Sequence, residues 1–214
     1  YKFAFDLRFL QSPPIGEMSE PFGDLQVGSS AMPFKRNPIR AEKIDSLARS
    51  LAQLPRIAWD NAANSSLERT LDDSANRRSI LPESFLTADE LLLVTTQIVR
   101  ELQVDENRIA QNLSIYGPFA AIERVLMALG KEGIDRQLMH ERFRQYAMSA
   151  WSETQNGAPN PLVRLIADDE HVKLHIQKDD LLELMDVDHY IGDAPQRSRH
   201  LVQTIREALT NFVS

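Results

Sequence analysis

The sequence contains no cysteine, which excludes disulfide bonds and thiolate metal sites and suits a reducing compartment. Positive charge is scarce as well, because 24 Lys and Arg residues are outnumbered by 31 Asp and Glu residues, giving a formal net charge of −7. That balance argues against a general nucleic-acid-binding protein. No apolar run approaches the length of a membrane span. With 43% hydrophobic and 26% charged residues among 214, the composition is that of a globular chain with a real core.

Convincing strand patterns are also lacking, and the helical spacing of apolar residues predicts an all-α fold. We expect one helix from Pro38 onward, kinked at Pro55 because proline removes a backbone donor. A second long and apolar helical pattern runs from Arg78 to about Leu102, and the capping-box form of Thr87-Ala88-Asp89-Glu90 leaves a break there open.

After Val104 the predicted segments shorten and turns multiply, which places a domain boundary there. Residues 1–103 are expected to be a long-helix segment of a central bundle, and residues 104–214 a smaller helical C-terminal domain. The helices expected in that second part are 119–129, a helix capped by Asp135, 162–167, 181–185 and 196–212.

Gly28 opens the most distinctive segment, which ends at Pro38 and reads Gly-Ser-Ser-Ala-Met-Pro-Phe-Lys-Arg-Asn-Pro. A glycine and two serines make a pliable start, and proline suits the first position of a helix. Unpaired backbone N–H groups at a helix start favour an anion, and Lys35 places a cation beside them. The segment therefore indicates a site for a negatively charged substrate.

Two catalytic motifs of similar composition do not fit this segment. A phosphate-binding P-loop requires Lys followed by Ser or Thr where this chain has Ser29-Ser30. An acylating Ser-x-x-Lys motif also fails, because Lys35 is too far from either serine. From residue chemistry alone, a solvated Gly-Ser turn before a basic helix start stays open as the alternative.

Residues 28–38 resemble the signature loop of the fumarase/aspartase superfamily, GSSxMPxKxNP, at every fixed position. Within that superfamily the segment is most similar to the adenylosuccinate lyase family, whose loop commonly reads Ser-Ser-Ala-Met-Pro-aromatic-Lys-Arg-Asn-Pro. A second block at 67–78, Leu-Glu-Arg-Thr-Leu-Asp-Asp-Ser-Ala-Asn-Arg-Arg, resembles the same family and not fumarase or argininosuccinate lyase.

The resemblance implies β-elimination of fumarate from adenylosuccinate, giving AMP, and from the succinylaminoimidazole carboxamide ribotide of purine nucleotide biosynthesis. Ser29 would be the general base, and Lys35 with loop N–H groups would stabilise its alkoxide. Lys35 and Asn37 would also hold the succinyl carboxylates. Ser30 and Met32 would contact the substrate from the same loop.

The resemblance assigns the nucleotide end of the substrate to Arg69, Ser74 and Arg78. An arginine fork can donate two parallel hydrogen bonds to a phosphate, and Ser74 and Arg78, four residues apart, share one helix face. The alternative is that the arginines of this block pair with its own Glu and Asp residues. Lys43 falls where some family members have a substrate-contacting arginine, so it is a further candidate that has lost the bidentate geometry.

The resemblance further implies a cytoplasmic homotetramer whose long helices form a shared bundle and whose active sites draw on three subunits. It favours one continuous helix from Arg78 to about Leu102. The signature loop lies well past the middle of these polypeptides. We therefore expect a C-terminal half whose general-acid histidine lies upstream of Tyr1, and no lyase activity from the 214 residues alone. Another lyase of the superfamily, or a catalytically silent helical module that acts by association, remains the alternative.

No cofactor or metal is expected. His171 and His175 lie four residues apart and could clamp a metal on a helix, but a third ligand pattern is lacking nearby. A solvated helix face is the simpler interpretation of this pair. The acidic run at 168–170 is interpreted as a solvated loop or helix end.

Overall fold

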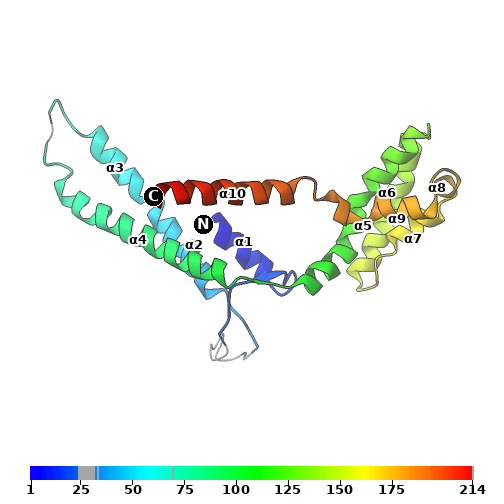
Figure 1. Ribbon diagram of the computed structural model, residues 1–214, viewed down its shortest axis with the longest axis horizontal. Coiled ribbons are helices and arrows are strands. Elements are labelled where there is room, and N and C mark those ends of the chain that lie inside the picture. Colours follow the sequence, from blue (N-terminus) through cyan, green and yellow to red (C-terminus); the bar gives the residue numbers. More distant parts are fainter. Residues whose placement is uncertain (24–31, 33, 69, 214) are drawn as a thin grey trace. The chain divides into compact units, whose positions relative to one another are not determined.

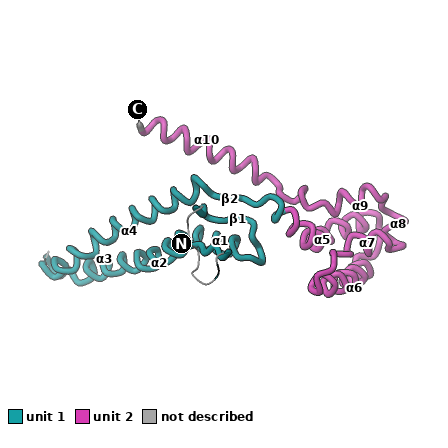
Figure 2. The backbone as a smooth tube through the Cα atoms, turned by 90° about the horizontal axis from the view of Figure 1, so that it is seen from below, with its two compact units in different colours: residues 1–109 teal, residues 110–214 magenta. Residues whose placement is uncertain are grey.

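The computed structural model describes residues 1–23, 32, 34–68 and 70–213, and within them the all-α prediction is confirmed (Figure 1). The backbone divides into two units, Tyr1–Ile109 and Ala110–Ser214 (Figure 2). The first unit contains α1 (Lys2–Gln11), β1 (Met18–Ser19), α2 (Ile39–Leu51), α3 (Leu54–Ala63), α4 (Ser74–Arg100) and β2 (Gln103–Val104). The second contains most of α5 (Glu106–Lys131), then α6 (Arg136–Gln155), α7 (Leu162–Asp168), α8 (Glu170–His175), α9 (Lys178–Met185), the 3₁₀ turn η1 (Val187–Tyr190) and α10 (Ala194–Val213).

Helices α1, α2 and α4 meet in the small apolar core of the first unit. Helix α3 packs along α4 but has no buried residue of its own. Two packed helices cannot cover each other's apolar surface completely, so this part of the unit leaves large apolar side chains exposed. The buried apolar residues of the core are Ala4, Leu7, Ala41, Ile44, Val94 and Ile98.

The long helices follow the sequence-based prediction in one case and depart from it in the other. Helix α4 is continuous through Thr87, as expected. The expected kink at Pro55 is instead a break, since α2 ends at Leu51 and α3 begins at Leu54. Pro55 then lies in the first turn of a new helix, where its missing N–H has no partner to lose.

A two-stranded antiparallel ribbon corrects the expectation that strands are absent. Met18 pairs with Val104, and Ser19 pairs with Gln103. Strands of two residues carry no alternating apolar pattern, so the sequence offered no signal for them. The ribbon joins the segment after α1 to the end of α4.

Arg108 fixes the turn that leads into this ribbon. Its guanidinium donates hydrogen bonds to the carbonyl oxygens of Pro13, Pro14 and Ile15 at 2.9–3.1 Å. Gly16 follows with φ of 66°, a left-handed conformation that favours glycine. The backbone that enters β1 is therefore held from a residue far away in the sequence.

The second unit has a larger core, formed by α5, α6, α7, α8 and α9. Asp135 caps α6 as predicted, accepting the N–H groups of Gln137 and Leu138 at 2.7 and 3.1 Å. Among the described helices, α5 is the one long and apolar enough to span a membrane by length and composition. A stretch of this length was not expected from the sequence. Val125 and Leu129 of α5 are buried in the core, while 28% of its most apolar stretch is buried altogether.

Asp169 corrects the interpretation of the acidic run as solvated. Only 3% of Asp169 is exposed, and its carboxylate accepts the N–H groups of His171 and Val172 at the start of α8, the helix that carries His171 and His175. The Tyr146 hydroxyl and the Arg142 guanidinium, both on α6, each lie 2.8 Å from it. Burial opposes ionisation, but these hydrogen bonds and the Arg142 charge outweigh it and lower the pKa of Asp169.

Candidate functional site

Part of the expected site can be located in the structure. Ser29, Ser30 and Arg69 lie outside the described residues, so their roles stay predictions. Lys35 and Asn37 lie in the segment that leads into α2, Lys35 exposed and Asn37 half-buried. Met32, on the same segment, is 42% exposed.

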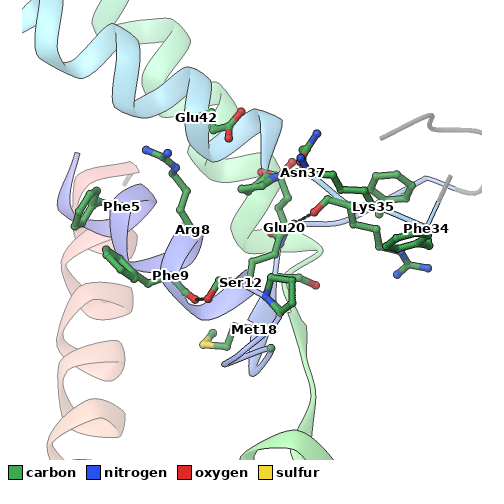
Figure 3. Close-up of a pocket in the computed structure, with 17 residues that line it drawn as sticks. Phe5, Arg8, Phe9, Ser12, Met18, Glu20, Phe34, Lys35, Asn37 and Glu42 are labelled. Atoms are coloured by element: carbon green, nitrogen blue, oxygen red, sulfur yellow. Dashed lines mark hydrogen bonds between the residues drawn. The ribbon is translucent and has the colours of Figure 1, made fainter. Parts of the chain in front are cut away.

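Lys35 and Asn37 line one cavity of about 580 Å³ at the N-terminal end of α2 (Figure 3). Helix α1, the turn that follows it and residues 34–38 form its walls. Aromatic rings and cations are prominent there, a combination suited to an anionic ligand with an apolar part. These residues are Phe5, Phe9, Phe22, Phe34, Arg8, Lys35 and Arg36.

Two of the three cations are engaged by protein groups. Arg8 Nη1 lies 2.7 Å from Oδ2 of Asp45, a residue that is 1% exposed, and this hydrogen bond raises the pKa of Arg8. The Arg36 guanidinium lies 5.3 Å from the ring centre of Phe22. Within the described part of the chain, the Lys35 ammonium makes no ion pair, so it is the cation best placed to receive an anion.

Lys43 lies on α2, and its ammonium is occupied by an ion pair within the protein. Its ammonium forms an ion pair with Glu90 of α4, and both side chains are partly exposed. Lys43 does not line the cavity. Its predicted contact with substrate stays a prediction and would compete with this pair.

The second motif lies at the start of α4. Ser74 is the first residue of that helix and is half-buried, and Arg78 follows one turn later and is exposed. Arg77 pairs with Asp73 at 3.2 Å, so the alternative of local ion pairs holds for Arg77. Neither Ser74 nor Arg78 lines the cavity, and among the described site residues the structure brings only Lys35 and Asn37 together there.

Gln11 and Glu20 were missed by sequence reasoning, although both line the cavity. Glu20 is 1% exposed and accepts the backbone N–H groups of Arg40 and Ala41. The one available signal was Pro38, which precedes α2 and has no side-chain acceptor to cap it. This pattern predicts that a residue elsewhere in the chain caps α2, but it does not identify that residue.

Two family models match the chain. One is described as "Adenylosuccinate lyase C-terminus" and covers residues 118–201, and the other is described as "Lyase" and covers residues 1–52. The adenylosuccinate lyase of Schizosaccharomyces pombe is 35% identical over 216 residues and covers 100% of the chain. That of Saccharomyces cerevisiae is 39% identical over 215 residues and covers 99%. The chain spans 44% of the length of each.

Solved structures are similar as well. The 3-carboxy-cis,cis-muconate lactonizing enzyme from Pseudomonas putida matches with a TM-score of 0.76 and 26% identity, over 90% of this chain and 42% of that protein. A fumarate lyase from Mesorhizobium sp. BNC1 matches with a TM-score of 0.72 and 23% identity, over 90% of this chain and 40% of that protein. At that identity the second likeness supports the fold alone.

Proposed function

The chain belongs to the adenylosuccinate lyase family, and we propose that its enzyme cleaves adenylosuccinate to AMP and fumarate by β-elimination. The same reaction would release fumarate from the succinylaminoimidazole carboxamide ribotide. The observation that carries this proposal is the placement of Lys35 and Asn37 in one cavity directly before the N-terminus of α2. A cation and an amide side by side form a receptor for a carboxylate. The start of α2 does not take part as the sequence suggested, because its N–H groups at Arg40 and Ala41 are already bonded to Glu20.

The proposed reaction moves one proton and breaks one carbon–nitrogen bond. Ser29, as its alkoxide, removes the proton beside a succinyl carboxylate, so negative charge accumulates on that carboxylate. Lys35 and Asn37 stabilise this charge more strongly in the transition state than in the ground state. The electron pair then forms the double bond of fumarate, and the amino group leaves with a proton from a general acid.

The nucleotide end of the substrate is assigned to the second motif. Arg69 and Arg78 are proposed to bind the phosphate and Ser74 a neighbouring group, with Ser30, Met32 and Lys43 as further substrate contacts. Since Ser74 and Arg78 do not line the cavity with Lys35, we propose that one subunit supplies the succinyl pocket and another the phosphate pocket. The exposed apolar surface of α3 and α4 supports a homotetramer in which these helices form a shared bundle. We place this enzyme of purine nucleotide biosynthesis in the cytoplasm.

Replacement of Ser29 tests the proposed reaction. In the full-length enzyme, Ser29→Ala should lower fumarate release from adenylosuccinate by about 10²–10⁴-fold, because a general base is lost. AMP should still bind, since the hydroxyl serves the proton transfer. The matched control is Ser50→Ala, an exposed serine of α2. Near-normal turnover by Ser29→Ala would remove this serine from the mechanism.

Lys35→Ala tests the cavity itself. Loss of the cation should weaken inhibition by free succinate and lower turnover together, because both depend on carboxylate binding. Lys2, an exposed lysine of α1, serves as the control in Lys2→Ala. Unchanged succinate inhibition in Lys35→Ala would place the carboxylate receptor elsewhere.

A further inference from the structure

Gln11 joins the two ends of the chain segment that contains the signature loop. Its side-chain oxygen accepts the backbone N–H of Glu20 at 3.0 Å, where the segment leaves the ribbon. Its side-chain nitrogen donates to the backbone carbonyl of Arg36 at 3.1 Å, where the segment returns toward α2. One side chain therefore connects residues 20 and 36 through their backbones.

Glu20 makes a second connection between the same two ends. Its Oε1 accepts the N–H of Arg40 at 3.1 Å, and its Oε2 accepts the N–H of Ala41 at 2.9 Å. The first N–H groups of a helix have no partner within the helix, and Pro38 has no side-chain acceptor to offer them. The carboxylate also lies at the positive end of the helix dipole. Glu20 is thus a helix cap supplied from about twenty residues upstream.

Glu20 is buried, and the neighbouring backbone fixes its position. The residue is 1% exposed, and a carboxylate removed from water must be hydrogen-bonded to be tolerated. Its backbone is held by the neighbouring ribbon, in which Ser19 pairs with Gln103 and the carbonyl of Glu17 accepts the N–H of Asp105 at 2.9 Å. The cap is therefore anchored to the scaffold of the first unit.

We propose that Gln11 and Glu20, together called the clasp, position Lys35 and Asn37 for the reaction. This inference rests on the proposed function. Lys35 and Asn37 flank Arg36, the residue whose carbonyl Gln11 holds, and Asn37 is two residues before the helix that Glu20 caps. Fixing Arg36 and the first turn of α2 fixes the backbone from which both side chains reach the cavity. The clasp acts through these two residues and is a positioning device.

The test measures hydrogen exchange and kinetics on the same variants of the full-length enzyme. In Glu20→Ala, amides in the first turn of α2 should exchange at least about tenfold faster, because their cap is gone. The kcat for adenylosuccinate should fall by roughly 10²-fold, since a small displacement of catalytic groups has an effect of that size. The KM should change far less, because the phosphate is bound by other residues. Glu20→Gln should recover part of both effects, since its one carbonyl oxygen can still accept a hydrogen bond.

Gln11→Met provides an independent variant that keeps the side-chain length and leaves the buried charge in place. It should lower kcat about tenfold with an unchanged helix content, because only the bonds to Glu20 and Arg36 are lost. The control is Glu101→Gln, an exposed carboxylate of the same unit, which should leave exchange and kcat unchanged.

The outcomes separate the clasp from the proposed function. Wild-type kcat in both Glu20→Ala and Gln11→Met would overturn the clasp and leave the lyase reaction standing. Unchanged exchange in Glu20→Ala would also overturn it, because the cap would then not hold the helix start. A wild-type enzyme that releases no fumarate would overturn the proposed function, and the catalytic role of the clasp with it.

Discussion

The α5–α9 part of the second unit buries its large apolar residues, whereas the first unit leaves many of them exposed. In the second unit, Phe143 and Leu129 are 1% exposed and belong to a core that five helices share. In the first unit, Phe85 on α4 is 75% exposed and Trp59 on α3 is 74% exposed. Exposed apolar surface on this scale marks an interface. We therefore expect the α5–α9 part of the second unit to fold on its own contacts. We expect the first unit to be covered by other protein, and α10 as well, since its Leu201 and Phe212 are 59% and 90% exposed.

The polar groups of the two units also differ in role: those of the second unit support folding, and those of the first unit line the candidate site. The second unit holds its helices together with internal polar contacts such as the buried Asp169. The first unit places its polar groups around a cavity and at the start of α2, where Lys35 is free of ion pairs within the described residues. We therefore expect substitutions in the second unit to change unfolding, and those in the first to change association and ligand binding.

The sharpest test of this contrast is a pair of phenylalanine substitutions. Phe143→Ala in α6 should lower the free energy of unfolding by about 3–5 kcal/mol, because it leaves a cavity in a closed core. Phe85→Ala in α4 should change the unfolding of the monomer by less than about 0.5 kcal/mol, because the ring is exposed. Denaturant unfolding monitored by circular dichroism measures both.

Phe85→Ala should instead weaken self-association, measured by sedimentation equilibrium across protein concentrations. Loss of stability from Phe85→Ala as large as that from Phe143→Ala would show that α4 is covered within one chain. Unchanged association would remove this face from the interface and break the proposed contrast.

Asp169→Asn tests the polar support of the second unit. Removing the charge should cost about 1.5–3 kcal/mol at pH 7, because hydrogen bonds from Tyr146 and Arg142 to a carboxylate are lost. The pKa of Asp169 is lowered by folding, so its contribution is present above its unfolded pKa of about 4 and is lost as the pH falls through the folded pKa. The wild type should therefore lose more stability below pH ~4 than the variant does.

Asp168→Asn is the matched control, because Asp168 is the exposed neighbour and pairs with the exposed Lys173. It should change the free energy of unfolding by less than about 0.5 kcal/mol. Parallel acid-unfolding curves for the wild type and Asp169→Asn would contradict the role given to Asp169.

The features that could be predicted from the sequence are those set by residues close together along the chain. The existence of α4 follows from apolar spacing, and the capping of α6 by Asp135 follows from a local pattern. The capping-box pattern at Thr87 left a break in α4 open, and the family resemblance favoured the continuous helix that the structure has. The grouping of Lys35 with Asn37 follows from a motif only two residues apart.

What the sequence did not predict depends on residues brought together by folding. Glu20 caps α2 from about twenty positions away, and Arg108 holds carbonyls more than ninety positions upstream. The acidic run at 168–170 gives no sign that Asp169 is buried, because its partners Arg142 and Tyr146 lie on α6. Neither composition nor spacing reports such pairs, since each requires the relative placement of two elements.

Arg78→Ala tests whether a residue of the first unit affects ligand binding without affecting unfolding. Arg78 is exposed at the start of α4, so its loss should leave unfolding unchanged. Binding of nucleotide substrates should weaken by about 1.5–3 kcal/mol, because a charge-assisted bond to phosphate is lost. Inhibition by free fumarate or succinate, which carry no phosphate, should stay the same. Equal weakening for both ligand classes would assign Arg78 to the succinyl end.

The smallest expected effects come from two glycines of α5, which differ in what surrounds them. A Cβ at Gly117 would lie 2.8 and 2.9 Å from the two methyl carbons of Val187, so Gly117→Ala must displace the turn η1. We expect a loss of about 1–3 kcal/mol in the free energy of unfolding, the usual effect of overpacking.

At Gly130 a Cβ would meet nothing within 4 Å. Gly130→Ala should therefore stabilise the second unit by up to about 1 kcal/mol, because alanine restricts the unfolded chain. Opposite signs for the two substitutions would confirm that η1 packs closely on α5, whereas stabilisation by both would mean that Val187 is not held there.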